Sequence, residues 1–162
     1  MTLIAVKREV AALIKQVFRG ANVNAGDNLR RRNWRQVTVP KSSAIRRNVA
    51  FSEAVYEDHS KVEDMECFLA KDEDEAEHFL KENKLTMLID PNGNCLKRFK
   101  PVAVVDAILA KKNLGTTRDM APITIALGPG FTAGKDVDVV VETMRGHRLG
   151  RIMKEGSAIP NT

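Results

Sequence analysis

The sequence predicts an α/β fold: a mixed sheet with short helices. Apolar runs of strand length occur at 85–89, 102–105, 123–127 and 137–141, each bounded by polar residues, glycine or proline. A capped amphipathic segment of helical length lies at 72–80. Strands with interspersed short helices indicate a sheet in which parallel and antiparallel pairs coexist.

The first fifty residues are harder to assign. Residues 3–18 carry apolar side chains at helical spacing and predict an amphipathic helix. Its apolar face would pack on the rest of the domain or on another subunit, so a homo-oligomer stays open. Residues 21–35 are rich in Asn, Gly and Arg without a period, which predicts a loop. We expect short strands at 36–39 and 48–51.

The next segment combines a short helix, a strand and a longer helix. Ser52 is placed to cap a short helix that continues through Tyr56. Apolar residues from Val62 to Leu69 indicate one half-buried strand with imperfect alternation. Asp72 is expected to cap the longer helix, because the acidic residues that follow it suit the positive N-terminal end of a helix.

The middle of the chain predicts a hairpin and a buried strand. Leu85–Ile89 and Cys95–Phe99 are interpreted as its two strands, because turn-forming residues connect them. The run at 102–105 predicts a strand that ends at Asp106. An acid at this place often contacts a ligand in α/β proteins. A carboxylate that caps a short helix at 107–112 explains Asp106 equally well.

The glycine-rich loop from Gly128 to Gly134 is the candidate site. Gly128 and Gly130 can adopt positive φ, and the N–H groups of residues 131–133 are free to face an anion. The loop fits a loose dinucleotide fingerprint, but a strand follows where that motif needs a helix, and it lacks the hydroxyl of a Walker loop. A tight structural turn and an anion site formed by backbone amides with Lys135 and Arg145 are the alternatives.

Of the three histidines, His147 is the candidate for a functional role, because it lies between Arg145 and Arg148 next to a glycine. The cations around it would depress its pKa, so a neutral imidazole could act as a base or ligand; an ordinary surface histidine is the alternative. We predict that one concave anion-accepting surface is formed by glycine-loop residues and two downstream residues: Gly128, Gly130, Thr132, Gly134, Arg145 and His147. Antiparallel pairing of the flanking strands would instead put Arg145 near Arg118 and Asp119.

Composition indicates a globular protein of the cytoplasm. Of the 162 residues, 43% are hydrophobic and 29% charged, which is enough for a sizeable core. No apolar run approaches the about 20 residues of a membrane helix, and the N-terminus is too charged for a signal peptide. Cys67 and Cys95 have no metal-ligand spacing; we interpret them as buried thiols, with a redox or selenium-related role as the alternative.

Charge is segregated along the chain, whose formal net charge is +5. Basic residues cluster with Trp34 between residues 30 and 47, and acidic residues cluster between 63 and 77. The basic run could bind nucleic acid through phosphate contacts and stacking. A solvated segment is the alternative we favour, so nucleic acid is not the partner we expect.

Four motifs make the chain recognisable: NLGTT (113–117), DMAP (119–122), GPGFTAG (128–134) and ETMRGH (142–147). In this order and spacing they resemble the YqeB-type accessory proteins of the selenium-dependent molybdenum hydroxylase system. The resemblance runs from residue 45 to Thr162. It implies ligand-binding candidates within and beside the motifs: Asp106, Asn113, Thr116, Thr117, Arg118, Asp119, Gly128, Gly130, Thr132, Gly134, Glu142, Arg145 and His147.

The two ends depart from that family. Its members resemble Rossmann-like proteins at the front, with a glycine-rich loop between a strand and a helix, whereas here Ala25-Gly26-Asp27 is followed by arginines. The family also continues into a β-rich region beyond the position of Thr162. We therefore expect a divergent segment at 1–45, with a degenerate Rossmann-like character, and a family-like α/β domain at 46–162.

The resemblance implies an accessory role in maturation or cofactor insertion of a selenium-dependent molybdenum hydroxylase related to xanthine dehydrogenase. A hydroxylase subunit or its maturation machinery would be the partner, and a nucleotide or molybdenum cofactor the ligand. The residues themselves present no catalytic triad, paired carboxylates or metal cluster, so we expect a non-catalytic protein without a bound metal. A small phosphate- or nucleotide-binding enzyme and a basic nucleic-acid-binding module are the alternatives.

Overall fold

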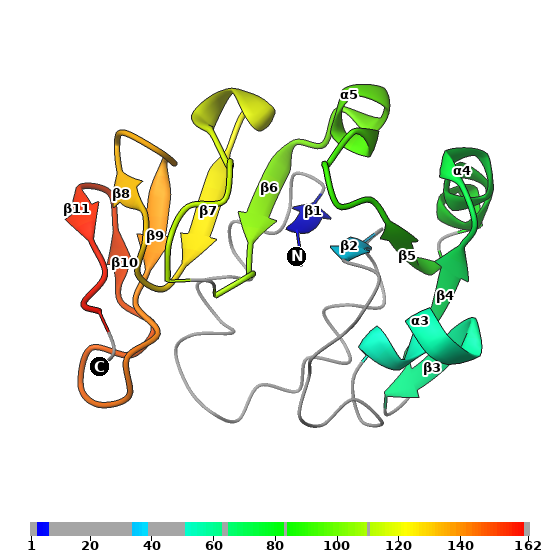
Figure 1. Ribbon diagram of the computed structural model, residues 1–162, viewed down its shortest axis with the longest axis horizontal. Helices are drawn as coiled ribbons and strands as arrows, with labels where there is room; N and C mark the ends of the chain where they lie inside the picture. Colours follow the sequence, from blue (N-terminus) through cyan, green and yellow to red (C-terminus); the bar gives the residue numbers. More distant parts are fainter. Residues whose placement is uncertain are drawn as a thin grey trace.

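The computed structural model describes residues 3–6, 34–38, 51–62, 65–82, 84–109 and 111–160 (Figure 1). Most strands belong to one sheet, with short helices between them. The strands are β1 (Leu3–Val6), β2 (Trp34–Thr38), β3 (His59–Val62), β4 (Met65–Ala70), β5 (Leu85–Ile89), β6 (Ala103–Asp106), β7 (Thr124–Leu127), β8 (Thr132–Ala133), β9 (Val139–Val141), β10 (Ile152–Met153) and β11 (Gly156–Ser157). The helices are η2 (Phe51–Glu53), α3 (Ala54–Glu57), α4 (Glu73–Lys81), α5 (Cys95–Phe99) and η3 (Arg118–Met120).

The main sheet has nine strands in the order β10-β9-β7-β6-β1-β2-β5-β4-β3. Parallel pairs join β2 to β5, β5 to β4, β6 to β7 and β7 to β9. The central β1 is antiparallel to both of its neighbours, and β3 and β10 are antiparallel edge strands. The predicted mixed α/β sheet is confirmed. Strands β1 and β2 lie at its centre, although both come from the segment expected to diverge.

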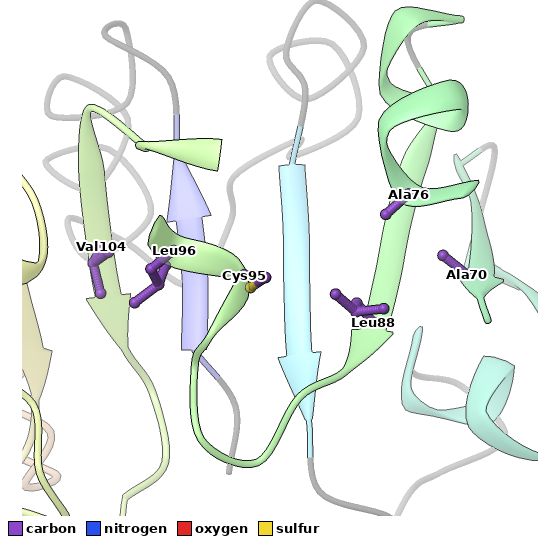
Figure 2. Packing of buried hydrophobic residues seen from close by; sticks show 6 residues of the cluster. All are labelled: Ala70, Ala76, Leu88, Cys95, Leu96 and Val104. Atoms are coloured by element: carbon purple, nitrogen blue, oxygen red, sulfur yellow. The ribbon is translucent and has the colours of Figure 1, made fainter. Parts of the chain in front are cut away.

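Helices cover both faces of the β4–β5 part of the sheet. Successive side chains of a strand point to opposite faces, so Cys67 and Met87 pack with Ala54 of α3 on one side. Leu88 packs on the other side with Ala76 of α4 and with α5 (Figure 2). Burying a side chain such as Leu88 stabilises the fold by about 1.5–3 kcal/mol. A further core cluster lies around β9, where Val137 and Val140 are fully buried.

Helix α4 begins as the sequence predicts. The Asp72 carboxylate accepts the Glu75 N–H at 2.8 Å, which confirms its capping role. The expected cap at Ser52 is wrong, because Glu53 is the N-cap of α3 and makes no side-chain capping hydrogen bond. The single strand expected at 62–69 is also wrong. It is two antiparallel strands, β3 and β4, paired from His59–Phe68 to Val62–Met65.

The hairpin expected at 85–99 is the clearest error. Strand β5 is confirmed, but Cys95–Phe99 forms helix α5. The Asp90 carboxylate accepts the Cys95 N–H at 2.7 Å, and the turn at Gly93 has φ +70°. Cys95, Leu96 and Phe99 then face the core at helical spacing, a pattern that a five-residue run cannot distinguish clearly from a strand.

The N-terminal assignments also change. The helix expected at 3–18 is wrong for Leu3–Val6, which forms β1, and residues 7–18 lie outside the described residues. Strand β2 begins at Trp34, inside the stretch expected to be a loop. Phe51 lies in η2 rather than in a strand. Backbone pairing with β2 on one side and β6 on the other outweighs the local helical spacing of residues 3–6.

In the later part of the chain, the predicted strands are present, and the predicted short helix is not found among the residues that the structure describes. Strands β6, β7 and β9 confirm the apolar runs that predict them, with bounds shifted by one or two residues. The short helix expected at 107–112 is wrong for the described residues 107–109 and 111–112, none of which is helical. Among the described helices, none combines the length and apolarity that crossing a membrane requires.

Candidate functional site

The carboxyl ends of β6, β7 and β9 meet at one edge of the sheet. The three strands are parallel, with Asp106 level with Ala126 and Leu127 level with Val141. Three loops therefore leave this carboxyl edge together: 107–117, 128–131 and 143–151. All three begin at the lower ends of these strands in Figure 1, and the first then returns towards η3. This edge is the usual place for a ligand in an open α/β sheet.

Asp106 anchors the first loop. Its side chain is fully buried; Oδ1 accepts the Ile108 N–H at 3.0 Å and Oδ2 accepts the Thr116 hydroxyl at 2.6 Å. The Asn113 side chain accepts the N–H groups of Gly115 and Thr116 and donates to the Thr116 carbonyl. Asp106, Asn113 and Thr116 thus form one hydrogen-bonded group that shapes the loop.

The glycine turn holds the three loops together. Gly128 has φ +81°, and a Cβ there would lie 2.8 Å from Thr143 Oγ1. Gly130 has φ +107°, and a Cβ there would lie 2.5 Å from the backbone nitrogen of Lys112. Both positions need glycine, because positive φ and close approach coincide. Gly128 therefore contacts the third loop and Gly130 the first.

Glu142 anchors the third loop. Its side chain is buried: Oε1 accepts the Thr143 and Met144 N–H groups at 2.8 Å each, and Oε2 accepts the Ile159 N–H at 2.9 Å. Burial alone would raise its pKa, but these three hydrogen bonds and the charge of Arg148 lower the pKa instead. The Glu142 carbonyl also accepts the Gly150 N–H, which closes the loop at its base.

The second half of the glycine loop folds back on itself. The Thr132 N–H, expected to face an anion, donates to Asp136 Oδ2 at 2.8 Å. Gly134 has φ +83°, and its N–H donates to the Val137 carbonyl. Ala133 pairs with Gly156 in the small sheet formed by β8 and β11. This segment carries the chain back to the start of β9, which allows β9 to run parallel to β7.

Arg118 and Asp119 lie at the opposite end of these strands. Arg118 Nη2 donates to Asp138 Oδ1 at 2.6 Å, and Asp138 Oδ2 accepts both the N–H and the hydroxyl of Thr124 at 2.9 Å. Burial would raise the pKa of Asp138, but these bonds lower it. Thr117 donates its hydroxyl to the Asp119 carboxylate. This group ties η3 to the first residue of β7.

Arg145 and His147 lie on the third loop, where both are exposed. The antiparallel pairing that would move Arg145 towards Arg118 is wrong, since β7 and β9 are parallel. The residues between β7 and β9 contain β8 and return the chain to the other end of the sheet. The two strands are therefore not joined by a hairpin. Arg145 and His147 therefore leave from the same edge as Gly128. A common anion-accepting surface stays a prediction.

The remaining candidate residues lie elsewhere in the fold or outside the described residues. Cys67 and Cys95 are both buried and free of disulfides, and burial raises the pKa of Cys67 to about 12. Trp34 and Arg35 lie in β2, while the rest of the basic run falls outside the described residues, as does Ala25-Gly26-Asp27. Where the chain is described, no group of three His, Cys, Asp or Glu side chains could hold a metal.

Sequence reasoning missed several residues that build the edge. Lys112 and Thr143 contact the glycine turn. Asp136 accepts the Thr132 N–H, and Asp138 accepts the Thr124 N–H. The acids of the KDVD segment carried a signal, because carboxylates between two strands commonly accept backbone N–H groups in turns. Lys112 and Thr143 carried none, since their contacts depend on the parallel pairing.

Comparison with known proteins gives one relationship. No protein-family model matches the chain, and no solved structure matches it significantly. Over 124 residues it is 49% identical to the uncharacterized protein YqeB of Escherichia coli strain K12. The chain spans 23% of that relative's length. Across 76% of its own length, this chain is therefore similar to that protein.

Proposed function

We propose that this protein acts in the maturation of a selenium-dependent molybdenum hydroxylase, in cofactor assembly or insertion, and does not itself turn over the hydroxylase's substrate. This is the role that the resemblance of the four motifs to the YqeB-type proteins implies. It places the protein in the cytoplasm, with a hydroxylase subunit or its maturation machinery as partner.

The observation that carries the proposal is the meeting of three family-like motifs at the carboxyl edge. Thr116 of NLGTT bonds to Asp106, Gly130 of GPGFTAG lies against Lys112, which precedes NLGTT, and Gly128 lies against Thr143 of ETMRGH. Separate stretches of sequence that resemble one family thus build one surface. A binding surface for a cofactor or partner accounts for this grouping better than three independent turns.

The chemistry of the edge suits binding rather than turnover. Its two buried carboxylates, Asp106 and Glu142, are saturated by backbone N–H groups and a hydroxyl. The lowered pKa of Glu142 keeps it ionised at neutral pH, so it would be a poor general acid. Both groups hold loops in place, which supports an accessory role.

Deletion of the gene in a host that makes such a hydroxylase tests the proposal. We expect the hydroxylase polypeptide to accumulate normally by immunoblot but to contain less molybdenum and selenium, measured on the purified enzyme by mass spectrometry. A plasmid copy of the gene should restore both elements. A selenium-independent molybdoenzyme of the same host serves as the control for general molybdenum supply. A hydroxylase with its full selenium and molybdenum content after deletion would exclude the role.

A further inference from the structure

Among the described residues, the exposed ionisable side chains on the loops of the carboxyl edge are all basic. Neither loop 107–117 nor loop 143–151 contains an Asp or Glu. Both carry basic residues that are exposed where described: Lys111, Lys112, Arg145, His147, Arg148 and Arg151. The acids at the base of these loops, Asp106 and Glu142, point inwards and are buried. A surface of this kind attracts anions.

Several of these cations have no close counter-ion. Within the described part of the chain, Lys112, Arg145 and Arg151 form no ion pair. By contrast, Arg98 on α5 contacts three acids of α4. Arg148 lies near enough to Glu142 to lower its pKa. Lys112, Arg145 and Arg151 are therefore available to an external anion, and Lys112 and Arg145 lie at or near the residues that contact the glycine turn.

The glycine turn brings these cations to opposite sides of one short segment. Gly130 lies against the Lys112 backbone and Gly128 against the Thr143 side chain, two residues before Arg145. Two residues of chain span at most about 7 Å. The long side chains of Lys112 and Arg145 can therefore converge above the turn. Arginine and lysine together suit a phosphate group, because arginine offers a planar fork of donors and lysine a point charge.

Apolar side chains flank the same segment. Leu109 is 55% exposed, yet its Cδ2 lies 3.4 Å from the position of a Cβ on Gly128. Leu149, on the third loop, is 52% exposed. A ligand with a phosphate and an apolar portion would contact the basic side chains through its phosphate and the leucine side chains through its apolar portion. This composition favours a small molecule over a nucleic-acid backbone, which would need a longer basic track.

We propose that the carboxyl edge of β6, β7 and β9 binds a phosphate-bearing small molecule of nucleotide size, with Lys112 and Arg145 on the phosphate and Leu109 beside the organic portion. The glycine turn forms the floor of this binding site. The Thr132 N–H does not bind the ligand, because it already donates to Asp136. This binding does not depend on the proposed role in hydroxylase maturation.

Isothermal titration calorimetry on the full chain tests the proposal, with inorganic pyrophosphate, ATP and a twelve-base single-stranded DNA as probes at constant ionic strength. We expect saturable one-to-one binding of ATP, with weaker binding of pyrophosphate. The double variant Lys112→Gln/Arg145→Gln should weaken ATP binding about tenfold or more, the effect of losing charge-assisted hydrogen bonds. Leu109→Ala should weaken ATP but leave pyrophosphate unchanged.

A matched variant separates this site from net charge. Lys71→Gln/Lys97→Gln removes two exposed positive charges elsewhere and should change ATP affinity less than twofold, about the effect of altered long-range charge alone. Thermal midpoints confirm that all variants are folded. Absence of saturable binding, equal losses in both double variants, or DNA that binds more tightly than ATP would each overturn the proposal.

Discussion

Gly130 lies directly against the backbone of Lys112, so closely that a Cβ would stand 2.5 Å from the Lys112 nitrogen. No side-chain rotation can relieve this contact, because the opposing atoms belong to the main chain. The contact joins the loop after β7 to the loop after β6. It is one of two that turn separate motifs into a single edge.

Gly130→Ala should therefore destabilise the protein by about 2–4 kcal/mol, from backbone strain at positive φ and from overpacking. Gly146→Ala is the matched control, because Gly146 has φ +121° with nothing within 4 Å of a Cβ. It should cost only the strain of about 1 kcal/mol. Urea unfolding measures both. Equal losses for the two variants would show that Gly130 is not in close contact with Lys112.

Replacing Glu142 tests the anchor of the third loop. Glu142→Gln should destabilise the protein at pH 7 by about 2 kcal/mol, because Gln has a single acceptor oxygen for the three N–H groups that the carboxylate binds. The pKa of Glu142 is lowered in the folded protein. Its stabilisation is thus present above the unfolded pKa of about 4.3 and is lost as pH falls through the folded pKa.

The difference between wild type and Glu142→Gln should consequently shrink when urea unfolding is repeated below the folded pKa of this group. Other carboxylates titrate in the same range but are common to both proteins, so they cancel in the difference. A difference that is unchanged between neutral and strongly acidic pH would mean that the charge of Glu142 contributes nothing.

Asp138 and Arg118 should differ in importance although they form one ion pair. Asp138→Ala leaves the N–H and hydroxyl of the buried Thr124 without their acceptor and should cost about 1–3 kcal/mol. Arg118 is half exposed, so Arg118→Ala should cost less than about 1 kcal/mol. Thermal unfolding of both variants decides the order. A larger loss for Arg118→Ala would contradict this account.

The two thiols should be inert in the folded state. Both are buried, and the pKa of Cys67 is raised to about 12, so the reactive thiolate is scarce at neutral pH. With Ellman's reagent, the native protein should release almost no chromophore within minutes. In denaturant, both thiols should react. Rapid reaction of one thiol in the native protein would revive the redox or selenium-related interpretation.

Some of the fold could be predicted from sequence because it depends on local chemistry. The Asp72 cap and the buried strands at β5, β6, β7 and β9 follow from side-chain type and spacing over a few residues. Leu3–Val6 was misassigned because its partners, β2 and β6, are distant in sequence. Propensity over four residues is weaker than pairing on both sides.

The candidate residues could be selected from the sequence, but their arrangement in space could not. Motif resemblance pointed to Asp106, Thr116, Gly128, Gly130 and Glu142, and the structure brings all five to the carboxyl edge. Their assembly depends on the parallel pairing of β7 and β9, which no local pattern of residues specifies. Arg118 and Asp119 belong to the other end for the same reason.

The single carboxyl edge requires that β7 and β9 run parallel, and a double-mutant cycle between Gly128 and Thr143 tests this arrangement most directly. A Cβ on Gly128 would meet Thr143 Oγ1 at 2.8 Å, so Gly128→Ala should be less harmful when Thr143→Ala has removed that atom. We predict a coupling free energy of about 0.5–2 kcal/mol from urea unfolding of the four proteins. Strictly additive losses would contradict the contact, and with it the single edge on which both proposals rest.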